Sequence, residues 1–66
     1  MNLNKLKGKI VERDKTYQKC ADYLGMSIAT FSDKMNEKRK FYIDELDKLG
    51  NFLEMTDGEK ADIFLH

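Results

Sequence analysis

The chain has 66 residues, of which 41% are hydrophobic and 36% are charged, and its twelve basic and twelve acidic side chains give a formal net charge of zero. This length predicts one small domain, and no apolar run approaches the roughly 18 residues that a membrane helix needs. Polar and apolar residues alternate over positions 1–7, unlike the continuous apolar core of a secretion signal, so we expect a cytoplasmic protein.

Apolar residues recur at helical spacing almost throughout the chain, and no segment shows the sustained alternation of a strand. Leu3, Leu6, Ile10 and Val11 form the first such stripe, which predicts a helix over residues 2–13. The complete pattern predicts an all-α fold, in which five short helices surround one core.

A second helix is expected to begin after Thr16, because a threonine hydroxyl can accept one of the unpaired backbone N–H groups at a helix start. Cys20, Ala21 and Leu24 would form its inner side. Gly25 marks its end, since a left-handed residue commonly follows a helix and only glycine adopts that conformation without steric cost.

A third helix follows almost at once. Met26 is expected to pack into the turn as an apolar plug, and Ser27 to cap a helix that extends to about Asn36. A polar, basic loop over residues 37–41 comes next. The apolar residues predicted to face the core from this helix are Ile28, Phe31 and Met35.

The fourth helix carries Asp44 and Glu45 in its first turn, where negative charge suits the helix dipole. Gly50 lies inside it and should cost about 1 kcal/mol relative to alanine, which a close contact with a neighbouring helix would explain. The stripe that predicts this helix comprises Ile43, Leu46, Leu49 and Leu53, with Phe52 beside it.

A capping box predicts the start of a fifth helix, because Thr56 is followed three residues later by Glu59. The apolar residues available to it are Ala61, Phe64 and Leu65.

Charge is distributed unevenly along the chain despite the neutral total. Residues 1–43 carry ten Lys/Arg against five Asp/Glu, whereas residues 44–66 carry two against seven. Because the local field rather than the total charge attracts a charged ligand, the first two-thirds of the chain are suited to a polyanionic partner.

Cys20 is the only cysteine and His66 the only histidine. They exclude an internal disulfide and a zinc site of Cys and His ligands within one chain. We expect Cys20 to be an unreactive core residue, and we assign no role to His66. No catalytic pairing or cofactor motif is visible, so an enzyme is not expected.

Residues 16–32 carry the most specific pattern in the sequence. A helix-turn-helix needs a small residue where its helices cross, a glycine in the turn and a polar cap on the second helix. Ala21, Gly25 and Ser27 meet these needs in order. The pattern therefore predicts that the second helix braces the third, which is offered to the major groove of DNA.

The sequence resembles the phage-repressor and Cro-like helix-turn-helix domains, also called the XRE family. The resemblance extends from Leu3 to about Phe64. It implies a five-helix, lambda-repressor-like domain that binds operator DNA in a sequence-specific way and regulates phage or prophage genes. Its signature residues are Thr16, Ala21, Gly25, Met26, Ser27, Thr30, Phe31 and Ser32, followed by Asn36-x-Lys38-Arg39 and the Ile43-Asp44-Glu45-Leu46 helix start.

The resemblance also implies a set of DNA contacts. Tyr17 departs from the family, which commonly has glutamine there, although Gln18 lies next to it. Ile28 and Ala29 offer only apolar contacts, for instance to a thymine methyl group. The implied contact residues are Thr16, Tyr17 and Gln18 before and within the second helix; Ser27, Ile28, Ala29, Thr30, Asp33 and Lys34 in the third; and Asn36, Lys38, Arg39 and Lys40 after it.

Two questions about partners stay open at this level. The neutral total charge, together with Ile28, Ala29 and Asp33 on the reading surface, also suits an antirepressor or modulator that keeps this fold but binds a repressor protein. A DNA-binding form is expected to dimerise, because two half-sites multiply affinity. The expected dimer contacts in the fifth helix are Ile63, Phe64 and Leu65.

Overall fold

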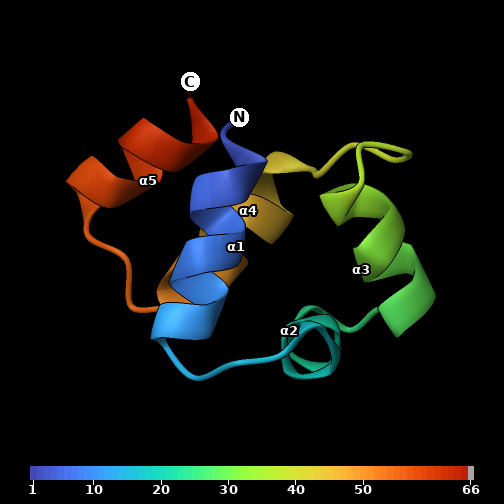
Figure 1. Cartoon of the computed structure of the whole chain (residues 1–66). Coiled ribbons are helices and arrows are strands. Elements are labelled where there is room, and N and C mark those ends of the chain that lie inside the picture. Colours follow the sequence, from blue (N-terminus) through green and yellow to red (C-terminus); the bar gives the residue numbers. More distant parts are fainter. Residues whose placement is uncertain (66) are drawn as a thin grey trace.

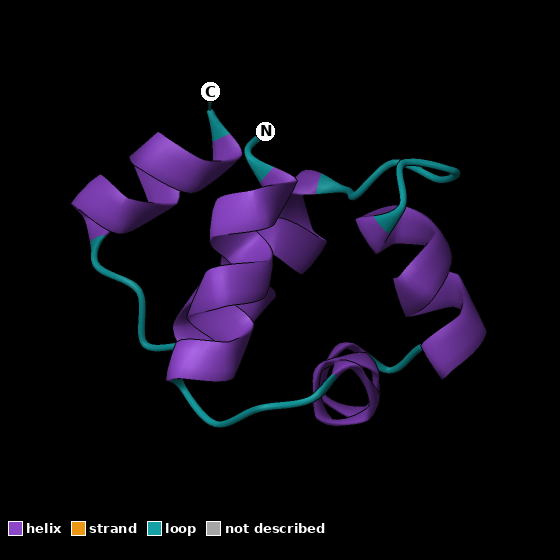
Figure 2. Ribbon diagram, viewed as in Figure 1, coloured by secondary structure: helices purple, strands orange, loops and turns teal. Residues whose placement is uncertain are grey.

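The computed structural model describes residues 1–65, and over these residues the chain forms five helices and no strand. They are α1 (Leu3–Glu12), α2 (Tyr17–Leu24), α3 (Ile28–Met35), α4 (Ile43–Phe52) and α5 (Asp57–Phe64), joined by short loops (Figure 2). The predicted all-α fold of five helices is therefore confirmed. His66, to which the sequence assigned no role, lies outside the described residues.

None of the helices in the described part of the chain has the length and apolar character needed to cross a bilayer.

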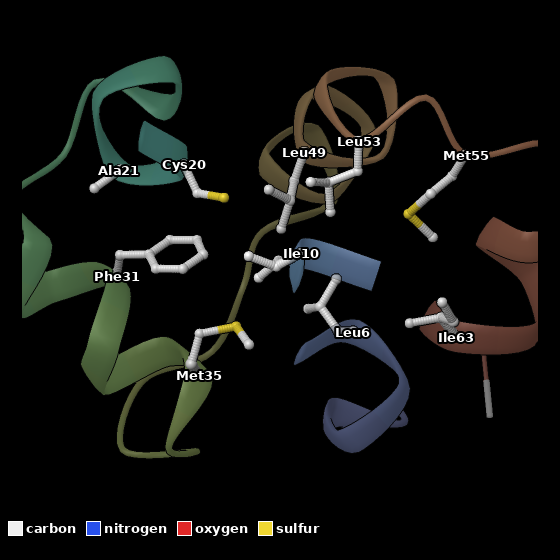
Figure 3. Packing of buried hydrophobic residues seen from close by; sticks show 10 residues of the cluster. All are labelled: Leu6, Ile10, Cys20, Ala21, Phe31, Met35, Leu49, Leu53, Met55 and Ile63. Carbon is white, nitrogen blue, oxygen red and sulfur yellow. The ribbon is translucent and has the colours of Figure 1, made fainter. Parts of the chain in front are cut away.

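The helices α1 and α4 occupy the middle of the molecule, with α3 on one side of them and α5 on the other (Figure 1). The close view of the core shows the same separation from another direction (Figure 3). The helix α2 closes one end and packs against both α3 and α4. The outer surfaces of α3 and α5 therefore face away from each other.

The core is continuous across all five helices (Figure 3). Phe31 is the largest of its fully buried side chains, and Cys20 is fully buried as predicted. Burial raises the pKa of the Cys20 thiol to about 11, so the thiolate is scarce at neutral pH and the residue is unreactive. The buried hydrophobic residues are Leu6, Ile10, Cys20, Ala21, Phe31, Met35, Leu49, Leu53, Met55 and Ile63.

Several residues of the predicted apolar stripes lie outside this core, and three of them are largely exposed. Val11 is 76% exposed, Ile43 87% and Leu65 77%. Ile43 lies six residues before the buried Leu49, which places it about 120° away around the helix axis. Ile43 is thus at the edge of the apolar face of α4, whose centre is buried at Leu49.

The sequence also misassigned the inner side of α5. Ile63 is buried and Phe64 is half-buried. Ile63 was predicted to lie in a dimer interface, but it packs into the core of its own chain and has no surface to offer a second copy.

A side chain from a neighbouring helix lies close to Gly50, which is one form of the contact that would explain a glycine inside α4. Gly50 is buried in α4, and a Cβ atom at this position would lie 2.8 Å from Cε of Lys60 in α5. The Lys60 side chain crosses this position and donates to Oδ1 of Asn51 at 2.7 Å. The glycine therefore leaves room for the Lys60 side chain to cross α4.

A polar clasp joins α1 to α5. Lys9 forms ion pairs with Glu12 and Glu59, Lys5 pairs with Asp62 at 2.6 Å, and the N–H of Asn2 donates to the carbonyl of Ile63 at 2.7 Å. Glu59 is also the second member of the predicted capping box, which is present in full.

The hydrogen bond from Lys9, followed by that from the Thr56 backbone, lowers the pKa of Glu59 from 4.5 to about 2. A carboxylate with a lowered folded-state pKa stabilises the fold above its ordinary pKa, and this contribution is lost as the pH falls toward the folded value.

We therefore expect the melting temperatures of the native protein and a Glu59→Gln variant to differ most above pH 4.5 and to converge as the pH falls toward 2. Circular dichroism melts at unit pH steps would measure this difference. Glu54→Gln is the matched control, because Glu54 is exposed and forms no ion pair with the described residues. A Glu59→Gln difference that stays constant from pH 6 to 2 would contradict the role of the clasp.

Candidate nucleic-acid interface

The joint between α2 and α3 is built from local hydrogen bonds. The hydroxyl of Thr16 accepts from the N–H of Lys19 at 3.1 Å, and the hydroxyl of Ser27 accepts from the N–H of Thr30 at 3.1 Å. Gly25 is left-handed with φ of 73°. These three residues confirm the predicted caps and turn, and they fix where each helix begins or ends.

Apolar contacts then hold α3 from its inner side. Ala21 is fully buried in α2, which lets the two helices approach. The ring of Tyr17 meets that of Phe31 edge-on, with centroids 5.3 Å apart, and Met26 packs against the core as the predicted plug. The α3 helix is thus anchored by one side only.

The opposite side of α3 is open. Ile28 is 45% exposed and Ala29 is exposed, so the prediction that Ile28 faces the core is wrong. Phe31 and Met35 define the inner face, and Ile28 falls at its margin in the first turn. Ser32 lies one turn beyond Ile28 on the same side, and its hydroxyl is 3.4 Å from Nδ2 of Asn36.

Ser32 was absent from the predicted contact residues. Its position could have been predicted from the helical repeat, because Ile28, Ser32 and Asn36 are spaced four residues apart and therefore lie on one side of a helix. The outer side of α3 therefore combines apolar groups at its start with small polar groups farther along.

The prediction that Lys34 contacts DNA from the outer side of α3 is also wrong in its placement of the side chain. The sequence placed it outward, within reach of guanine or phosphate, but only 6% of it is exposed. Its Nζ lies 2.5 Å from Oε1 of Glu45 in α4 and 4.7 Å from the ring centre of Tyr42. Lys34 follows Phe31 by three residues and therefore shares its inward direction. The lysine links α3 to α4 and is not free for a ligand.

Asp33 and Arg39 form an exposed ion pair, with Oδ2 and Nε 3.6 Å apart. The carbonyl of Asp33 also accepts from the N–H groups of Lys38 and Arg39, at 2.8 and 3.3 Å. These bonds turn the basic loop back over the C-terminal end of α3. Asp33 thus has a cationic partner of its own within the chain.

The loop leaves two cations available. Lys38 and Lys40 are exposed, and neither forms an ion pair with any described residue. They lie directly after α3, as the sequence predicted, in the loop that joins α3 to α4 and lies beside α3 (Figure 1).

The start of α2 is less available than predicted. Tyr17 is half-buried against Phe31, and burial raises the pKa of its hydroxyl. Gln18 is exposed, but its Nε2 donates to Oδ1 of Asp22 at 2.8 Å. Gln18 is thus engaged within its own helix, and the Tyr17 ring is held in place by its contact with Phe31.

No protein-family model, no curated protein and no solved structure matches this chain. The likeness to phage repressors therefore stays a prediction from the residues quoted above.

Across the described residues, no group of three or more His, Cys, Asp or Glu side chains is arranged to hold a metal ion. The features of the site are a firmly held short helix, an open outer side and a flanking basic loop.

Proposed function

We propose that this protein is a sequence-specific DNA-binding regulator of transcription, of the phage-repressor or Cro type, which inserts α3 into the major groove of operator DNA. The observation that carries the proposal is the one-sided anchoring of α3. Its inner side is fixed by Phe31 and Met35, and its outer side is free. A major groove about 12 Å wide admits such a helix.

The outer side of α3 offers chemistry for reading base edges. Ile28 and Ala29 are exposed apolar groups that suit thymine methyl groups. Ser27, Thr30 and Asn36 supply hydroxyl and amide groups for hydrogen bonds. In this proposal these five residues would select the sequence.

The phosphate contacts come from the flanking segments. Lys38 and Lys40 would neutralise phosphates, and Arg39 would join them while partly engaged with Asp33. Gln18 and the capped start of α2 at Thr16 would meet the backbone on the other side. Such contacts fix the register of the protein on the duplex without reading its sequence.

Selection of bound duplexes from a random DNA pool tests the proposal directly. We expect an enriched motif, and an inverted repeat in it would mean that two copies bind together. Binding without any enriched sequence, or no binding at micromolar protein, would contradict a sequence-specific regulator.

With the selected duplex, the double variant Lys38→Ala/Lys40→Ala should bind more weakly, and by a similar factor to selected and scrambled DNA. Log affinity falls with log salt by a slope of about −0.9 for each phosphate contact. Losing two contacts should therefore make the slope less steep by about 2. Fluorescence anisotropy between 50 and 200 mM salt would measure it. Lys48→Ala is the control, because this exposed lysine lies on α4; an equal effect of Lys48→Ala would contradict the assigned surface.

A second candidate function draws on the same surface. Lys34, the one lysine of α3, is buried, and the first turn of α3 exposes Ile28 and Ala29. These features suit an antirepressor or modulator whose α3 binds a repressor protein. The DNA selection separates the two, since a modulator would enrich no sequence.

A further inference from the structure

An apolar groove lies between α4 and α5. The helix α5 lies on the side of α1 and α4 that is away from α3 (Figure 1). Ile43 and Leu46 form its α4 wall, and Ala61, Phe64 and Leu65 its α5 wall. Ile43 and Leu65 are the most exposed large hydrophobic residues of the described chain. Single exposed apolar residues are ordinary, but a contiguous group of them marks an interaction site.

Acidic residues border this groove. Asp47 and Asp57 contribute to its lining, and Asp44 follows Ile43 at the start of α4. Asp44 and Asp57 are exposed and form no ion pair with the described residues. Asp47 is 3.7 Å from the one lysine of the groove, Lys60, which is also held by Asn51. The lining therefore carries two carboxylates against one engaged cation, and Asp44 adds a third carboxylate nearby at the start of α4.

We propose that this groove docks a basic amphipathic helix of a partner protein. Apolar side chains spaced three and four residues apart on such a helix would enter between α4 and α5. Lysine or arginine side chains beside them would meet Asp44, Asp47 and Asp57. Opposite charges around an apolar contact raise the association rate and select the partner.

A second copy of this chain fits the groove less well. A two-fold dimer places the same surface against itself, which would bring the carboxylates of Asp44, Asp47 and Asp57 toward their own equivalents. Like charges brought together in an interface are unfavourable. Ile63, which a dimer through α5 was expected to use, is buried within the chain.

The proposal is independent of the proposed DNA-binding function. The helices α3 and α5 lie on opposite sides of α1 and α4, so the α5 wall of the groove is separated from the outer side of α3 (Figure 1). A partner in the groove and a duplex on α3 would therefore bind the same molecule together.

The test uses the whole chain and two synthetic peptides of about 15 residues, long enough for a helix. One has leucine at positions spaced three and four apart and lysine elsewhere, and the other has glutamate in place of each lysine. Titration followed by NMR should show shifts at Ile43, Leu46 and Phe64 with the lysine peptide only. Equal binding of the glutamate peptide, or no binding of either peptide, would overturn the proposal.

Ile43→Ser combined with Leu65→Ser should weaken binding of the lysine peptide by about tenfold or more. Both residues are exposed, so the fold is retained. Val11→Ser is the matched control, because Val11 is equally exposed but lies on α1, and it should leave binding unchanged. Binding to the selected duplex is measured in parallel and should not change in the double variant. Sedimentation showing a dimer that the double variant dissociates would overturn the proposal in favour of a second copy.

Discussion

Replacement of Phe31 by alanine should destabilise the domain by about 3–5 kcal/mol, the usual cost of removing a large buried ring. Phe31 is fully buried, and its ring meets Tyr17 at 5.3 Å and Phe41 at 5.9 Å between centroids. It therefore links α2, α3 and the loop before α4. At 0.05–0.15 kcal/mol per residue, a chain of this size has only about 3–10 kcal/mol in total. The substitution should therefore remove a large share of the stability, and at the lower end of this range the variant should be unfolded at room temperature.

Urea denaturation followed by circular dichroism measures this loss. Val11→Ala is the control, since truncating a side chain that is exposed on the surface should change stability by less than about 0.5 kcal/mol. Under the proposed function, Phe31→Ala should also abolish DNA binding, because the variant no longer holds α3 in place. A loss of less than about 1 kcal/mol would mean that α3 does not depend on this ring.

Replacement of Glu45 by alanine should lower the free energy of unfolding by a similar amount, about 3–5 kcal/mol, because it leaves the Lys34 ammonium buried without its partner. The Lys34 and Glu45 side chains are only 6% and 16% exposed, and their charged atoms are 2.5 Å apart. Oε1 of Glu45 also accepts from the N–H of Tyr42 at 2.9 Å, which caps α4. The single substitution therefore removes an ion pair and a helix cap together.

A matched double variant separates the charge from the packing. Lys34→Met combined with Glu45→Leu removes both charges and keeps similar side-chain volume, so it should be more stable than Glu45→Ala alone. A double-mutant cycle with the single variants, measured by urea denaturation, should show a coupling energy above about 0.5 kcal/mol. Additive effects would contradict a paired, buried role for Lys34.

This pair also bears on recognition. Under the proposed function, with Lys34 held in the interior, charge for phosphate binding would come from Lys38 and Lys40, and α3 would present neutral groups and Asp33 to the bases. Under the proposed function, affinity for any DNA would depend on the loop, and the choice of sequence on α3. The two properties are therefore separable by substitution.

The sequence by itself determined the helices and the points where they begin and end. Thr16, Ser27 and Thr56 each cap a helix through an N–H three residues away, and Gly25 supplies the left-handed turn. These interactions lie within one turn of the chain, so they follow from local residue order. The centre of the core followed in the same way from apolar spacing, as Leu6, Ile10, Phe31 and Leu49 illustrate.

Only the tertiary structure decided how each short helix is rotated about its axis. A lysine such as Lys34 is placed outward by its polarity, but α4 supplies Glu45 as a buried partner across the core. Conversely, Ile43 and Leu65 are apolar but lie beyond the reach of any packing helix. A helix of two or three turns has a broad apolar face, and the neighbouring helices determine which part of it is covered. The open side of α3 and the groove between α4 and α5 are both parts of helix surfaces that no neighbouring helix covers.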